Sequence, residues 1–313
     1  MNTKSNQLWR RLWIYQSERF PIFQHGLLIL AFTYAAVNYS VLSRGGEAFI
    51  SLPYFLVGVL TTLCLFFSLR VLDEVKDKKK DAQFRSHLPV PRGLVTIKEL
   101  AWIGLVFALL VSTLIGIVYP RMFLPLTLVL AYLALMTLEF FIPRLLNKNL
   151  LIYASSHMLI IPFIDIYASG LDWYMKGLNP HTGLILFFVV SFFNGMTIEV
   201  GRKIKAPKDE APGVDTYSSI LGTRKSLGLW LMVLSTTFFT ALIAIVHAQL
   251  IWVSAVILCL VFGVALRKAF LFSRGYTSAR AKSIENISGI WTLSMYLTLG
   301  GLPDLIITQI YKL

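Results

Sequence analysis

The chain has few charged residues and almost no cysteine. Charged residues make up 14% of its 313 positions and hydrophobic residues 56%, and the mean hydropathy is +0.69, a composition that excludes an ordinary soluble domain. Cys64 and Cys259 both lie in apolar stretches, so the sequence offers neither a disulfide framework nor a CxxC metal site. It also lacks the HExxH motif, the P-loop and the glycine-rich dinucleotide fingerprint. We therefore expect a multi-span membrane protein.

Acidic residues are scarce. Sixteen Asp and Glu residues stand against 29 Lys and Arg residues, which gives a net charge of +13. The basic residues lie in short stretches between apolar runs rather than along one soluble face. We interpret them as topology signals and lipid-phosphate contacts, and we expect no nucleic-acid partner.

Apolar stretches long enough to cross a membrane predict the fold. A spanning helix needs about 20 mostly apolar residues. Nine stretches qualify, at 22–43, 52–72, 98–118, 122–142, 150–169, 182–200, 226–247, 249–267 and 287–308. We expect an all-α membrane protein, a bundle of nine transmembrane helices in one domain (1–313). An interfacial arm (1–21) precedes the first helix, and loops 73–97 and 201–225 form a polar cytoplasmic cap.

The basic residues also predict an orientation. With nine alternating spans, all but four of the 29 Lys and Arg residues fall on one side of the membrane. The four exceptions are Arg44, Arg121, Lys176 and Lys312. Because cytoplasmic loops carry the excess of Lys and Arg, we expect a cytoplasmic N-terminus and a C-terminus outside.

Acidic residues recur every four positions where the second apolar stretch ends. Asp73, Asp77 and Asp81 lie one turn apart if the helix continues, with about 6 Å between successive Cα atoms. Carboxylates suit hard cations, and Mg²⁺ commonly joins one or two of them to phosphate oxygens. The spacing therefore favours a divalent-metal site that holds a phosphorylated lipid. The alternative is a solvated loop with weak i,i+4 ion pairs.

A second mixed-charge loop follows the sixth stretch, on the same predicted side. It runs from Glu199 to Gly222 and contains Asp209. Two such loops on one face indicate a common ligand, so we expect their basic side chains to bind phosphate charge. These predicted substrate-binding residues are Arg85, Arg202, Lys203 and Lys205.

The two loops together resemble the motifs of the UbiA superfamily of intramembrane prenyltransferases. That family's first motif reads N/D-D-x-x-D-x-x-x-D and is followed by P-x-P-x-G, and its second motif ends in D-x-x-x-G-x-x-T-x-x-x-x-x-G. The matching positions are Asp73, Glu74, Asp77, Asp81, Pro89, Pro91 and Gly93 in the first motif, and Asp209, Gly213, Thr216 and Gly222 in the second. Nine helices, with the motifs after the second and the sixth, also fit the family.

The chain departs from the family pattern in both motifs. In the first, Asp73 replaces the usual Asn, Glu74 the usual Asp, and Leu88 an Arg.

In the second motif, counting back from Gly213 places Lys205 and Gly201 where further aspartates are expected. Glu199 fills one of these places only if the loop shifts by two residues, and Asp209 alone is in register.

The resemblance implies a metal-dependent transfer of an isoprenyl group from an isoprenyl diphosphate to a lipid-soluble or amphipathic acceptor, among membrane lipids. The implied cofactor is Mg²⁺, which Mn²⁺ can replace. The implied catalytic residues are Asp73, Asp77, Asp81 and Asp209. The implied metal ligands are Asp73, Glu74, Asp77, Asp81, Glu199 and Asp209.

Three alternatives remain open: an intramembrane terpene cyclase of the same fold, a transporter, and a catalytically weakened family member. A transporter more often shows internal repeats and broken helices at the midplane, and the sequence has no persuasive repeat. Among polar residues inside the spans, we expect Glu139 and Asp165 to reach the interface from predicted helix ends.

Overall fold

The computed structural model describes residues 3–46 and 48–310, and side chains at 7–46, 48–146 and 148–308. Helices and loops make up this part of the chain, which contains no strand. Residues 1 and 2 of the predicted arm and Lys312 of the topology prediction lie outside it. The expected all-α fold is confirmed.

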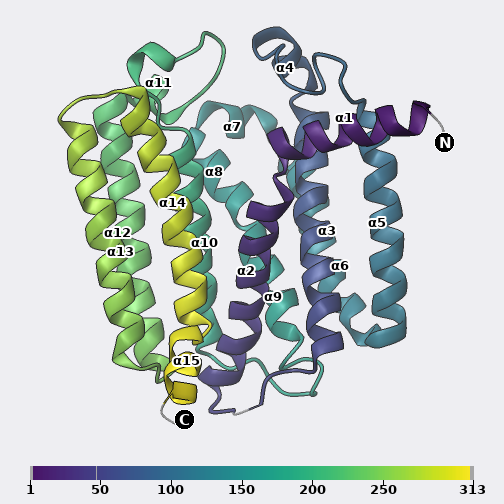
Figure 1. Cartoon of the computed structure of the whole chain (residues 1–313), viewed down its shortest axis with the longest axis vertical. Coiled ribbons are helices and arrows are strands. Elements are labelled where there is room, and N and C mark those ends of the chain that lie inside the picture. The colour runs from purple at the N-terminus through teal and green to yellow at the C-terminus, as the bar shows by residue number, and fades with distance from the viewer. Residues whose placement is uncertain (1–2, 47, 311–313) are drawn as a thin grey trace. The chain divides into compact units, whose positions relative to one another are not determined.

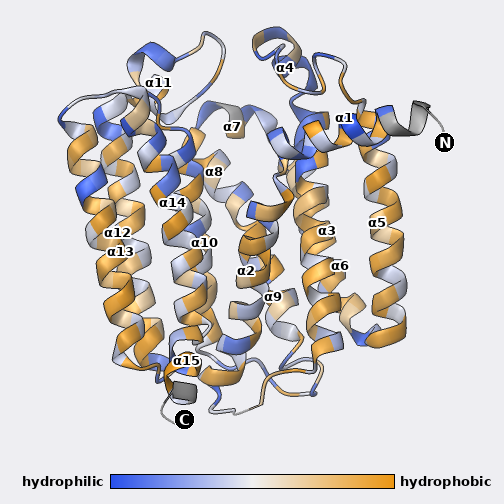
Figure 2. Ribbon diagram, in the orientation of Figure 1, coloured by the Kyte–Doolittle hydropathy of each residue, from blue (hydrophilic) through white to orange (hydrophobic). Residues whose placement is uncertain are grey.

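Eight helices of the described part are long and apolar enough to span a membrane, and a bent pair makes nine if it counts as one span. The eight are α2 (Ile22–Ser43), α3 (Leu52–Lys76), α5 (Ile97–Val118), η1 with α6 (Pro120–Met122 and Phe123–Thr137), α8 with α9 (Leu150–Met158 and Ile160–Gly170), α10 (Leu184–Arg202), α12 (Thr223–His247) and α13 (Trp252–Ser273). The bent pair is α14 (Ser278–Leu299) with α15 (Leu302–Ile310). Hydrophobic residues line these helices, and hydrophilic residues gather at helix ends and loops (Figure 2).

The chain divides into two compact units, each of which we describe by itself. Unit 1 comprises Met1–Leu30 and Leu52–Phe123, and unit 2 comprises Ala31–Ser51 and Leu124–Leu313. Each unit contains one of the two predicted motifs. The expectation of a single domain stays a prediction.

Unit 1 is built around the pair α3 and α5, which pack along one another (Figure 1). The helix α1 (Thr3–Arg19) lies across their ends. Its Tyr15 packs in a small core with Val71, Val95 and Leu100. The start of α5 is fixed by a capping box, in which the Thr96 side chain accepts a hydrogen bond from the backbone of the third helical residue. The predicted interfacial arm is therefore a helix bound to the end of the unit that carries the first motif.

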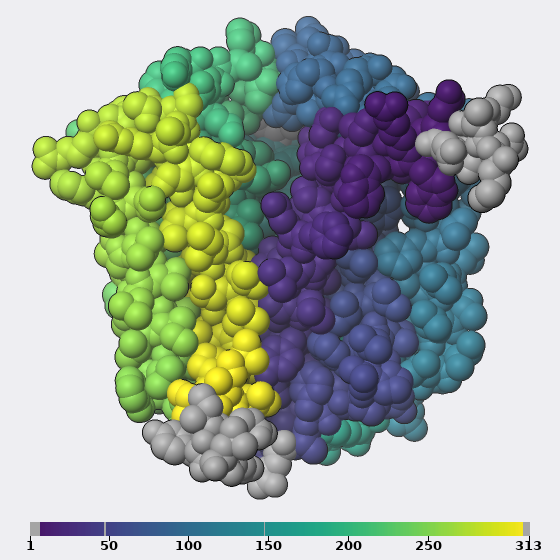
Figure 3. Space-filling view, in the orientation of Figure 1, coloured from purple at the N-terminus to yellow at the C-terminus, as the bar shows by residue number. Residues whose placement is uncertain are grey.

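Unit 2 is built on α10, which packs against α12 and α14, while α13 packs along α14. Figures 1 and 3 show α13 and α14 side by side. Large side chains, among them Trp230, Trp291 and Phe187, are fully buried in this unit. Helices in lipid are not driven together by the hydrophobic effect, so their packing depends on van der Waals contact, which small residues allow at close range. Small residues on α10 therefore set how closely other helices approach the start of the second motif, which begins at the end of α10.

Three predicted spans differ from the observed helices. The fourth ends at Thr137 and not at 142, because Glu139–Phe141 adopt positive φ angles of 49° to 60°. The fifth is broken at Leu159, just before Pro162, whose ring removes a backbone donor. The ninth begins at Ser278 and bends by 53° after Leu299.

The prediction for Asp165 was wrong. Its side chain does not reach the interface but is fully buried in unit 2, and neither carboxylate oxygen has a hydrogen-bond partner in the described part of the chain. The hydroxyls of Ser191 and Tyr296 lie nearby and are joined at 2.9 Å. The helix ends at Gly170, one residue past the predicted end of the span at 169, so the error concerns the burial of the side chain and not the helix boundary.

Candidate functional site

The first acidic segment continues the helical hydrogen-bond ladder past the end of α3. The N–H of Asp77 donates to the Asp73 carbonyl at 2.9 Å, and the N–H of Asp81 donates to the Asp77 carbonyl at 2.8 Å. The helix α3 ends at Lys76 and α4 (Lys78–Phe84) begins at Lys78, so only Asp77 lies outside both helices. The sequence prediction that these three acids rise one turn at a time therefore agrees with the backbone.

Glu74 is buried in an arginine cluster. Its Oε1 accepts from Arg19 Nε at 2.8 Å and lies 3.1 Å from Arg70 Nη2. Burial, and secondarily the Glu74 carboxylate, raise the pKa of the neighbouring Tyr15 to about 12, so the phenol is neutral at physiological pH. Because Glu74 already binds two cations, it fixes α1 to α3. From sequence, Arg19 was counted only among the topology signals, and its ion pair with Glu74 was not predicted.

The other acids of the segment differ in exposure. Asp73 is half exposed and lies 3.7 Å from Arg70. Asp81 is 2% exposed; its Oδ1 lies 3.2 Å from Arg85 Nη1, while its buried Oδ2 accepts no hydrogen bond among the described residues and lies 4.0 Å from Arg19 Nη2. A buried carboxylate oxygen without a donor is costly. Asp81 therefore offers an oxygen to a cation, and Arg85 lies beside it.

No group of three or more His, Cys, Asp and Glu side chains is assembled for metal binding anywhere in the described ranges. Magnesium usually keeps waters and takes one or two carboxylates together with substrate phosphate oxygens. Two carboxylates of the first segment, with an available oxygen on Asp81, meet that requirement. The segment thus fits a magnesium ion that binds together with a phosphorylated substrate.

The Pro-x-Pro-x-Gly segment forms a tight loop tied to α1. Gly93 has a φ of +74°, which favours glycine, and the N–H of Leu94 donates to the Pro89 carbonyl at 2.9 Å. Arg92 pairs with Glu18 of α1 at 2.7 Å, and this hydrogen bond lowers the pKa of Glu18. The matched residues of this loop therefore shape the backbone beside the acids.

The second segment begins where α10 ends. The N–H of Lys205 donates to Ser218 Oγ at 2.7 Å, and the N–H of Tyr217 donates to the Lys203 carbonyl at 3.1 Å. These bonds tie the start of the segment to α11 (Tyr217–Leu221), and η3 (Pro207–Asp209) lies between. The segment is therefore a folded loop and not an extended, solvated stretch of charged residues.

The glycines and threonine that match the second motif build this loop. Gly213 and Gly222 have φ angles of +76° and +81°. Thr216 caps α11 by accepting from the N–H of Ser219 at 2.9 Å, and its hydroxyl donates to the Glu210 carboxylate at 2.7 Å. Gly213, Thr216 and Gly222, three of the four matched positions, are thus needed for the backbone shape of the loop. Asp209 is the matched residue that remains as a candidate for a role in the reaction.

Glu199 is buried between two basic side chains. It lies one turn before the end of α10, where Arg202 Nε donates to its Oε2 at 2.7 Å and Lys203 Nζ lies 2.6 Å from its Oε1. Both oxygens are therefore occupied. Asp209 is exposed, 10 residues further along the chain.

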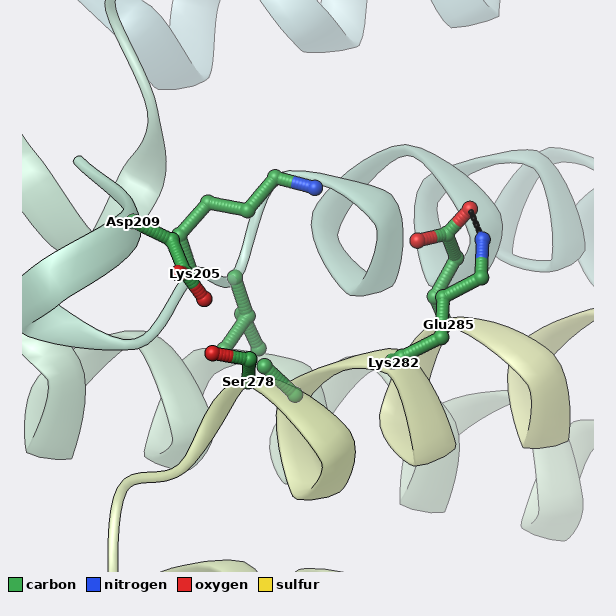
Figure 4. Close-up of a pocket in the computed structure, with 7 residues that line it drawn as sticks. Lys205, Asp209, Ser278, Lys282 and Glu285 are labelled. Carbon is green, nitrogen blue, oxygen red and sulfur yellow. Dashed lines mark hydrogen bonds and ion pairs between the residues drawn. The ribbon is translucent and has the colours of Figure 1, made fainter. Parts of the chain in front are cut away.

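Lys205 and Asp209 line a pocket of about 310 Å³ in unit 2 (Figure 4). The opposite wall is the start of α14, where Ser278 lies and Lys282 pairs with Glu285 at 2.7 Å. Lys205 and Asp209 were predicted as site residues from the second loop. The α14 residues were not, because they lie about 70 positions away and match no motif.

Family membership follows from the whole chain and not from these loops alone. The profile described as the UbiA prenyltransferase family matches residues 27–292, which is most of the chain. The chain belongs to the UbiA prenyltransferase family. The resemblance seen in the sequence is confirmed, and with it a multi-pass membrane protein.

Two solved structures share the fold of this UbiA family member. The apo structure of a UbiA homolog from Aeropyrum pernix K1 matches with a TM-score of 0.68 at 15% identity, over 90% of this chain and 98% of that one. A UbiA homolog from Archaeoglobus fulgidus, bound to DMAPP and Mg²⁺, matches with a TM-score of 0.51 at 16% identity, over 88% and 98%. No curated protein matches the chain.

Proposed function

We propose that this protein is a magnesium-dependent intramembrane prenyltransferase that moves an isoprenyl group from an isoprenyl diphosphate to a membrane-soluble or amphipathic acceptor. Membership of the prenyltransferase family over residues 27–292 is the observation that supports this most. The homolog from Archaeoglobus fulgidus binds DMAPP, an isoprenyl diphosphate, together with Mg²⁺.

The first acidic segment supplies the metal ligands in this proposal. Asp73, Asp77 and Asp81 would hold the ion, and Asp81 Oδ2 is a buried oxygen that accepts no hydrogen bond and has Arg19 Nη2 4.0 Å away. When bound, magnesium would neutralise diphosphate charge and so favour departure of the diphosphate from the isoprenyl carbon. Glu74, expected as a fourth ligand, instead keeps two arginines in place beside the acids.

The basic residues divide into two groups by their contacts. Arg85 lies 3.2 Å from Asp81 and is half-buried, so it is placed to bind phosphate oxygens next to a metal held by that carboxylate. Arg202 and Lys203 neutralise Glu199. Lys205 lines the pocket with Asp209, and we keep both as proposed substrate-site residues.

The bond changes of the proposed reaction balance without any oxidant or reductant. The bond between the isoprenyl C1 and the diphosphate oxygen breaks, and the electron pair leaves with the diphosphate. A carbon or heteroatom of the acceptor forms the new bond to C1 and loses a proton. In a cyclase, a double bond of the isoprenyl chain itself would attack C1 instead, and the resulting carbocation would lose a proton to give a hydrocarbon or be captured by water to give an alcohol.

Turnover of geranyl, farnesyl and geranylgeranyl diphosphates by the purified protein tests the proposal. Reactions contain magnesium or EDTA, with and without a membrane-lipid extract, and products are identified by mass spectrometry. A prenyl adduct that needs both magnesium and the extract is the expected result. A hydrocarbon or alcohol formed without the extract would show a cyclase, and no metal-dependent consumption of any diphosphate would refute the proposal.

A further inference from the structure

The second segment keeps only one of the acidic residues at the family's metal-ligand positions. Mg²⁺ takes one or two carboxylates together with phosphate oxygens, and the family pattern places these acids near the end of α10, at 201, 205 and 209. In this chain those positions hold Gly201, Lys205 and Asp209. The structure shows that neither the first position nor Glu199 nearby can fill the gap.

Gly201 has no room for a side chain. A Cβ at this position would overlap Ser288 Oγ of α14 and lie 3.1 Å from Trp230 Nε1 of α12. Ser288 Oγ is itself held at 2.9 Å by Trp230 Nε1, and both side chains are buried. An aspartate therefore cannot be accommodated where α10, α12 and α14 meet.

Glu199 cannot serve in its place. Both carboxylate oxygens are bound by Arg202 and Lys203, three and four residues ahead on the same helical turn. Residues three and four positions apart on a helix are neighbours, and both cations lie beside the carboxylate. A magnesium ion at Glu199 would have to displace these cations or approach two positive charges, which Coulomb repulsion disfavours.

Lys205 occupies a position where the family pattern has an aspartate. It is half-buried at the pocket wall, and within the described part of the chain its ammonium takes part in no ion pair, unlike Arg202, Lys203 and Lys282. An aspartate that holds one Mg²⁺ carries a combined charge of +1. A lysine carries the same charge, so the substitution conserves the local charge without a metal.

We propose that the second segment binds no metal and that Lys205 itself binds a phosphate oxygen of the isoprenyl diphosphate. The only metal site of the proposal is then the first acidic segment of unit 1, which would take up one divalent ion. This inference rests on the proposed function, since it names how the diphosphate of that reaction is held. Asp209 remains in the pocket as a carboxylate without a metal.

Counting bound Mn²⁺ by electron paramagnetic resonance tests the stoichiometry. The full chain in detergent is titrated with Mn²⁺ in the presence of geranylgeranyl thiolodiphosphate, an analogue that does not ionise. We expect one Mn²⁺ per chain, none in Asp77→Asn, and still one in Asp209→Asn. Two Mn²⁺ per chain, reduced to one by Asp209→Asn or Glu199→Gln, would overturn the inference. Absence of both Mn²⁺ and analogue binding would instead refute the proposed function.

The role of Lys205 has its own measurement and control. Lys205→Ala should raise the Kd of the analogue about tenfold or more, the loss of one charge-assisted contact, with the Mn²⁺ count unchanged. Lys205→Arg should keep most of the affinity. Lys208→Ala, which removes an exposed lysine of the same loop that does not line the pocket, should change the Kd less than twofold. Equal effects of Lys205→Ala and Lys208→Ala would overturn the assignment.

Discussion

A single methyl group at Gly201 should destabilise the protein, because this position lies at the crossing of three helices. The added Cβ would overlap Ser288 Oγ, closer than side-chain atoms tolerate. Ser288 would have to turn away and give up the hydrogen bond that it accepts from Trp230 at 2.9 Å. Both consequences follow from atoms buried in unit 2.

The magnitude follows from three contributions. Overpacking a tight contact costs about 1–3 kcal/mol, and a buried indole N–H that loses its acceptor costs about 1–3 kcal/mol more. Alanine gains up to about 1 kcal/mol of helix propensity over glycine, and less here, because Gly201 lies next to the last residue of α10. We expect Gly201→Ala to lower the free energy of unfolding by about 3 kcal/mol.

The assay compares Gly201→Ala with a matched glycine and with a double mutant. Gly228 lies within α12 and has no atom near its virtual Cβ, so Gly228→Ala should be neutral or stabilising by up to about 1 kcal/mol. In a Ser288→Ala background, where the hydrogen bond is already lost, Gly201→Ala should cost less than half as much. Unfolding is followed by tryptophan fluorescence in a denaturant titration at fixed detergent. Equal costs in the two backgrounds, or equal behaviour of the two glycines, would refute the steric account.

Three further predictions concern the acids. Asp77→Ala should abolish product formation while Lys79→Ala has a smaller effect in the turnover assay, and equal mild losses would indicate a merely solvated loop. Asp209→Ala should reduce turnover more than Asp215→Ala, because only Asp209 lines the pocket; the reverse ranking would show that the second motif is misaligned. Asp172 is buried just after α9 and accepts hydrogen bonds from Arg44, Lys176 and Ser40. Burial favours a raised pKa at Asp172, but these hydrogen bonds outweigh it and lower the pKa. Its contribution to stability should be full above about pH 4 and disappear as the pH falls through that lowered value, and Asp172→Asn should remove this pH dependence of the unfolding midpoint.

Sequence predicted the elements whose signal is local and missed the contacts that depend on tertiary packing. Apolar runs located every span, since a membrane helix needs one continuous stretch. The breaks were missed where single residues decide them, such as the left-handed turn at Glu139–Phe141 and the bend after Leu299. Asp165 was misplaced because its burial depends on two neighbouring helices, α10 and α14, that no local pattern identifies.

The candidate site shows the same division. The four-residue spacing of Asp73, Asp77 and Asp81 is a local property, and the backbone follows it. One of the two arginines that bind Glu74 is distant in sequence, because Arg19 lies on a helix 55 residues earlier. A motif can therefore identify which residues are acidic, whereas the structure decides which of those acids are available to a ligand.

The second motif separates residues that shape a loop from residues that bind a ligand. Gly213, Thr216 and Gly222 are needed for turns and a cap whatever the loop binds, since their roles are satisfied by backbone geometry. A family member can lose acids from such a loop and keep its fold, so retained glycines alone do not indicate a retained metal site. What distinguishes a weakened member from one that binds phosphate differently is the group that replaces the acid. Here it is Lys205, a cation without an ion-pair partner in the described chain, and a lysine at that place favours an anionic ligand over an empty site.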